Sequence, residues 1–66
     1  MSLIAINDVY GDRHFVMRED YEGTRYKHLI PLYTSKGMKL SAFYERMGWD
    51  NKPVMIHRDN IKSIPQ

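Results

Sequence analysis

The chain has 66 residues, a formal net charge of +2 and no cysteine. A chain this short forms one small domain, and without cysteine neither a disulfide nor a thiolate metal site can stabilise it. A hydrophobic content of 42% with 27% charged residues is typical of a folded domain rather than a disordered segment. No apolar run approaches the roughly 20 residues of a membrane span, and we expect no signal peptide. The sequence therefore predicts a single domain over residues 1–66, in a cytoplasmic protein that has no contact with membranes.

Two short strands are predicted near the start of the chain. Leu3 to Ile6 is an apolar run that suits a buried strand. His14 to Met17 alternates in character, with Phe15 and Met17 on one face and Val16 on the other. Turn-forming residues separate the two runs, so we expect a hairpin; these residues are Asn7, Asp8, Gly11 and Asp12.

The next segment is predicted to be a turn followed by the longest strand. Arg18 to Gly23 is polar and ends in glycine, which is typical of a turn. Thr24 to Tyr33 alternates over ten residues, but Pro31 cannot donate to a strand ladder. This strand is therefore an edge, or is broken or bulged, at Pro31, and its edge is available to a partner strand.

A short helix is the element that the sequence predicts most clearly. Apolar residues at i, i+3, i+4 and i+7 lie on one helical face between Leu40 and Trp49. Ser41 is the expected N-cap, and Gly48 suits the left-handed position just after the helix. Trp49 would then contact Tyr44 in a Schellman motif. So short a helix is marginal in isolation, so we expect it to pack on the strands.

The remaining chain predicts one or two further strands. Val54 to His57 is a strand with Val54 and Ile56 directed inward, and Asp59 is the expected cap of a single helical turn. The predicted class is α+β, a small antiparallel sheet in the order β-β-β-α-β with one short helix. Two architectures fit this order: an SH3-like barrel, in which a turn at Arg58–Asn60 precedes the last strand, or an open sheet with the helix across one face.

No group of residues predicts catalysis, a metal site or a cofactor. The three histidines, His14, His28 and His57, lie on separate predicted strands rather than at zinc-ligand spacing. The early carboxylates suit turns better than a calcium loop. The chain also lacks a nucleophile motif. We therefore expect a protein that is not an enzyme.

Surplus aromatic and basic residues predict a binding surface instead. A domain of this size usually needs additional stabilisation, which self-association or another protein can supply. Five tyrosines, five methionines and one tryptophan exceed what a minimal core requires, and Tyr, Trp, Met and Arg dominate interface hot spots. We predict a non-enzymatic regulator or inhibitor that binds another protein. The expected contact residues are Tyr26, Tyr33, Arg46, Trp49 and Lys52.

Nucleic-acid binding is the alternative prediction from the same composition. Single strands are held by cations on their phosphates and by rings stacked on their bases. The residues expected to contact phosphates are Arg25, Lys27, Lys36 and Lys39. A net charge of +2 is modest for such a protein, so protein binding is preferred.

Overall fold

The computed structural model describes residues 2–23, 28–50 and 53–63 of the chain. It has a three-stranded antiparallel sheet in the order β2-β1-β5 and a two-stranded antiparallel sheet of β3 and β4. The predicted α+β class is confirmed at this level, and no closed barrel is found among the described residues. The elements, in chain order, are β1 (Leu3–Asp8), β2 (Arg13–Met17), α1 (Arg18–Glu22), β3 (Leu29–Pro31), α2 (Leu40–Met47), β4 (Met55–His57), a 3₁₀ turn η1 (Arg58–Asn60) and β5 (Ile61–Ser63).

The predicted hairpin of β1 and β2 is confirmed. Its antiparallel register pairs Leu3 with Met17 and Ile6 with His14. Strand alternation then directs Ile6 and Val16 to the same side, where both are completely buried. β1 is longer than predicted because Asn7 and Asp8, which were assigned to the turn, also pair with β5.

The turn before the last strand lies where the sequence predicted it, but its cap differs. η1 spans Arg58–Asn60 and leads directly into β5. His57 is the N-cap residue, and its Nδ1 accepts a hydrogen bond of 3.2 Å from the backbone N–H of Asp59. The prediction that Asp59 caps the turn is wrong because Asp59 already lies inside it.

The segment Arg18–Glu22 forms the short helix α1, where the sequence predicted a turn. A five-residue helix offers too few positions to show helical periodicity, so its single apolar residue gave no signal. That residue, Tyr21, packs against the core from the outside. The Arg58 guanidinium lies over the Tyr21 ring at 5.0 Å from its centroid, which joins α1 to η1.

β3 is much shorter than the predicted strand Thr24–Tyr33. It covers Leu29–Pro31, and just beyond it the Leu32 N–H still donates to the Val54 carbonyl at 2.9 Å. Residues 24–27 of the predicted strand lie outside the described residues. Beyond β3, an isolated bridge pairs Tyr33 with Phe15, and the Tyr33 N–H donates to the Phe15 carbonyl at 2.8 Å. This bridge connects the two sheets.

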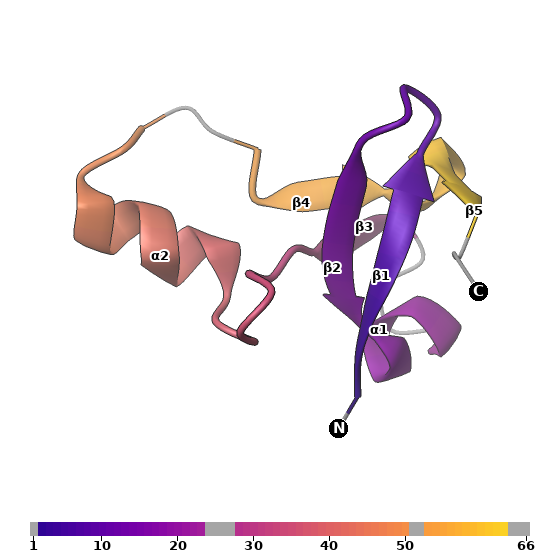
Figure 1. The fold of residues 1–66 in the computed structure, drawn as a ribbon, viewed down its shortest axis with the longest axis horizontal. Coiled ribbons are helices and arrows are strands. Elements are labelled where there is room, and N and C mark those ends of the chain that lie inside the picture. The colour runs from indigo at the N-terminus through magenta and orange to yellow at the C-terminus, as the bar shows by residue number, and fades with distance from the viewer. Residues whose placement is uncertain (1, 24–27, 51–52, 64–66) are drawn as a thin grey trace.

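The core lies between the two sheets. In Figure 1, β3 and β4 cross behind the β1–β2 hairpin. Every described strand except β5 contributes a buried aliphatic side chain. Ile61 of β5 packs against this cluster from the side. The buried apolar residues are Ile6, Val16, Ile30, Leu32 and Ile56.

α2 does not cover a sheet face, contrary to the open-sheet prediction. It projects to one side of the strands in Figure 1, and none of its residues is buried. The two sheets already bury each other's inner faces, so no inner face is left for a helix. Leu40, at the beginning of α2, is the residue of this helix that packs against the core, and its N–H donates to the Leu32 carbonyl at 2.9 Å.

The helix also begins differently from the prediction. Its N-cap position is Lys39, which makes no side-chain capping bond, and Ser41 lies within the first turn. The prediction of Ser41 as N-cap is wrong because the helix begins at Leu40, whose N–H bonds to Leu32, and the N-cap lies two residues earlier than predicted.

Candidate functional site

The C-terminal end of α2 is closed by a Schellman motif, as the sequence predicted. Gly48 has φ = 70°, a left-handed conformation that glycine adopts without steric cost. Its N–H donates to the Glu45 carbonyl at 3.2 Å, and the Trp49 N–H donates to the Tyr44 carbonyl at 2.9 Å. The chain reverses at this point, so the indole of Trp49 folds back along the helix.

Three rings gather around this reversal and form what we call the α2 aromatic cluster: Phe43, Tyr44 and Trp49. The Trp49 ring lies 5.7 Å from Tyr44 and meets Phe43 edge to face at 6.0 Å, between ring centroids. Phe43 and Tyr44 are themselves 5.8 Å apart. These distances are those of favourable aromatic pairs. The cluster is therefore ordered by contacts within α2 and its terminus rather than by the core.

The α2 aromatic cluster leaves much apolar surface exposed. Trp49 is 47% exposed, and Met47, one turn from Phe43 and Tyr44, is 50% exposed. Arg46 is exposed beside them, in the last turn of the helix. Large apolar side chains gathered on one exposed helix face, with a cation at the edge, have the composition of a protein-interaction surface. We call Phe43, Tyr44, Arg46, Met47 and Trp49 the α2 surface.

Two of the five predicted contact residues lie on this surface. Arg46 and Trp49 belong to it. Tyr33 is half-buried at the bridge between the sheets and is held there by its pairing with Phe15 and Lys39. Tyr26 and Lys52 lie outside the described residues, so their predicted role stays a prediction.

Three residues of the α2 surface were missed as binding residues, namely Phe43, Tyr44 and Met47. The sequence assigned them correctly to one helix face, and we expected the strands to cover that face. Periodicity identifies an apolar face but does not say what covers it. The signal that was present is the helix length, because an eight-residue helix depends on contacts made elsewhere, which a partner can supply as well as a strand.

Two of the four residues predicted to contact phosphates lie among the described residues. Lys36 and Lys39 are exposed in the segment that leads into α2. A closed turn holds this segment, since the Gly37 N–H donates to the Thr34 carbonyl and the Met38 N–H donates to Thr34 Oγ1. Within the described ranges, no ion pair involves Lys36, Lys39 or Arg46. Arg25 and Lys27 lie outside those ranges.

A second polar site lies at the turn between β1 and β2. Asp8 is buried, and its Oδ1 accepts hydrogen bonds from the N–H of Tyr10 at 2.9 Å and of Asp12 at 2.8 Å. His14 Nε2 donates to the other oxygen, Oδ2, at 2.8 Å. The bond from His14 is the main reason that the pKa of Asp8 lies below its usual range, and the bonds from Asp12 and Tyr10 act in the same direction against the opposing effect of burial.

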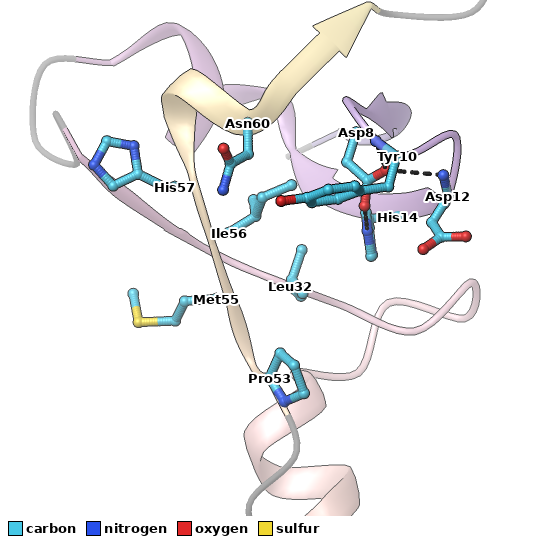
Figure 2. A pocket seen from close by; sticks show the side chains of 10 residues that line it. All are labelled: Asp8, Tyr10, Asp12, His14, Leu32, Pro53, Met55, Ile56, His57 and Asn60. Atoms are coloured by element: carbon cyan, nitrogen blue, oxygen red, sulfur yellow. Dashed lines mark hydrogen bonds and ion pairs between the residues drawn. The ribbon is translucent and has the colours of Figure 1, made fainter.

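The Asp8–His14 pair forms one wall of a pocket of about 310 Å³, drawn in Figure 2. Leu32 and Ile56 form an apolar floor, and Tyr10 and Asn60 direct polar groups over it. The Asp8 carboxylate stabilises the turn, because its two oxygens accept three hydrogen bonds there. Among the described residues, no three acidic or histidine side chains lie close enough to hold a metal ion.

The histidines do not converge. His28 and His57 lie near each other, with ring centroids 5.9 Å apart, while His14 is bonded to Asp8.

No helix among the described residues is long and apolar enough to cross a membrane. Comparison of the chain with protein families, with characterised proteins and with solved structures found no match.

Proposed function

We propose that this protein is a non-enzymatic binding module, a small regulator or inhibitor, that contacts another protein chain through the α2 surface. The observation that carries the proposal is the half-exposed pair of Met47 and Trp49 on a helix that none of the described strands covers. Burying these side chains in a partner removes apolar area from water, at roughly 25 cal/mol per Å².

The composition of the surface supports a specific contact. Trp and Arg are the residue types most enriched among interface hot spots, and here Trp49 and Arg46 lie within one turn of each other. The neighbouring rings hold Trp49 in place before binding, which lowers the entropy lost when a partner immobilises it. The predicted contacts of Tyr33, Tyr26 and Lys52 with a partner remain part of the proposal.

A photo-crosslinking experiment tests the proposal. A photoreactive phenylalanine analogue replaces Met47 in one variant and Lys62, an exposed residue of β5, in the control. Irradiation in the native host should give a discrete adduct from position 47 and none from position 62. The adduct should disappear when Trp49→Ala is added. Equal labelling from both positions, or no adduct from position 47, would contradict a binding role for α2.

The proposed architecture is an SH3-like barrel that α2 interrupts between β3 and β4. Three observations support it: β5 returns to pair with β1, η1 precedes β5, and the Phe15–Tyr33 bridge joins the two sheets. A fold of this kind hosts many unrelated functions, so it adds nothing to the choice of partner.

Nucleic acid is the second candidate partner, favoured by the exposure of Lys36 and Lys39 next to the aromatic helix. Each phosphate contact to a single strand adds about 0.7 to the slope of log affinity against log salt. Fluorescence anisotropy with a single-stranded oligonucleotide should then show a slope about 0.7 shallower for Lys39→Glu, with Lys62→Glu as the charge-matched control. Equal slopes for the two variants, or no binding at low salt, would exclude this candidate.

A further inference from the structure

The apolar positions of α2 are symmetric along the helix. Leu40, Phe43, Tyr44 and Met47 follow one another at intervals of three, one and three residues, so the pattern reads the same in both directions from a midpoint between Phe43 and Tyr44. A two-fold interface requires a self-complementary surface, because each residue meets its counterpart across the axis. An antiparallel copy of α2 placed at this midpoint puts Phe43 opposite the second copy's Tyr44, and Met47 opposite the part of its Leu40 that the core leaves uncovered.

The total surface of the chain also fits a second copy. The protein exposes 5031 Å², whereas a compact monomer of 7.9 kDa exposes about 4,400 Å². The excess of about 600 Å² is on the order of the ~800 Å² per partner that a standard specific interface buries. A domain with five fully or nearly buried apolar side chains among its described residues gains stability from covering that surface.

Lys39 at one end of α2 and Asp50 just beyond the other end complement each other only in the antiparallel orientation. The first turn of α2 holds no acidic residue, and Lys39 at its N-cap makes no capping bond. Asp50 is exposed just beyond the other end. An antiparallel copy brings Asp50 towards the N-terminus of the facing helix and Lys39 towards its C-terminal carbonyls. In both placements the side-chain charge is opposite in sign to the nearby end of the helix dipole, which is favourable.

We propose that the protein forms a two-fold dimer in which the α2 helices of two copies pack antiparallel, centred between Phe43 and Tyr44. This inference rests on the proposed function, since it identifies the partner of the α2 surface as a second copy of this chain. Each copy then covers the other's Met47 and Trp49, and the short helix receives the packing that its own strands do not provide.

Sedimentation equilibrium over micromolar to millimolar concentrations gives the first test. The wild-type chain should sediment as a dimer at the upper concentrations. Met47→Glu places two carboxylates in the apolar interface and should weaken dimerisation by at least about tenfold, equivalent to about 1.4 kcal/mol. Lys62→Glu, which also adds negative charge at an exposed position, should leave it unchanged. A wild-type monomer throughout, or equal effects of the two variants, would overturn the proposal.

Single cysteines test the orientation, because the natural chain has none. With a rise of 1.5 Å per residue, the two copies of position 44 lie about 1–2 Å apart along the axis, and the two copies of position 47 lie about 10–11 Å apart. Both positions lie on the apolar face, so a short bis-maleimide should link Tyr44→Cys dimers much faster than Met47→Cys dimers. Equal rates at both positions indicate parallel helices and contradict the proposal.

The photo-crosslinking experiment separates this inference from the proposed function. An adduct at position 47 with twice the mass of the chain supports the second copy. An adduct of any other mass, with a wild-type chain that sediments as a monomer, keeps the protein-binding role and eliminates the dimer. Absence of any adduct eliminates both.

Discussion

Stability should depend more strongly on the core than on the α2 aromatic cluster, although the cluster contains the largest side chains. Ile30→Ala removes aliphatic groups from a site that is completely buried between the two sheets. At about 0.8 kcal/mol per buried CH₂, with a further contribution from the cavity, the expected loss is about 3–4 kcal/mol. A domain of this size has roughly 3–5 kcal/mol in total, so this variant should be largely unfolded at 25 °C.

Trp49→Ala should cost far less. Trp49 is 47% exposed and contacts two rings of its own helix terminus, so its removal leaves no internal cavity. Loss of the two ring contacts predicts a decrease of about 1–1.5 kcal/mol, most of it as fraying of α2. A tryptophan buried in the core would instead cost about 3–5 kcal/mol.

Urea denaturation followed by far-ultraviolet circular dichroism measures this difference. The samples should be dilute, so that self-association does not add to the stability of α2. Ile30→Val, expected to lose about 0.5–1.5 kcal/mol, provides a core variant that remains folded enough to measure. If Trp49→Ala in dilute solution destabilises the chain as strongly as Ile30→Ala, α2 packs within the core and the binding argument is wrong.

The remaining predictions concern the hairpin and the helix terminus. Because the pKa of Asp8 is lowered in the folded state, its contribution to stability is complete above its ordinary value near 3.8 and is lost as the pH falls below that value. In urea denaturation at pH 7, Asp8→Asn should therefore have a lower free energy of unfolding than wild type, and this difference should narrow by pH 3. The control, Asp12→Asn, should have nearly the same free energy of unfolding as wild type. A difference for Asp8→Asn that is the same at pH 7 and pH 3 would refute the explanation from the ionised carboxylate. Gly48→Ala should destabilise the end of α2 by about 1 kcal/mol, because alanine is strained at φ = 70°. Gly23→Ala, at φ = −76°, is the control without strain, and equal hydrogen-exchange rates of the α2 amides in the two variants would contradict the motif.

Local sequence signals determined the elements whose causes are local. The β1–β2 hairpin follows from alternation and turn residues, and the end of α2 follows from Gly48 with an aromatic residue after it. Each depends on interactions between residues close in the chain, so the printed sequence contained the information.

Tertiary structure decided which surfaces are covered. The amphipathic pattern of α2 predicted its apolar face, but the packing of the β3–β4 pair on the β1–β2 hairpin left no sheet face for that helix. For the same reason the sequence did not show that Trp49 is exposed while Tyr33 is held at a bridge between sheets. Burial depends on which distant segments pack together, and one linear pattern of apolar residues is compatible with several packing arrangements.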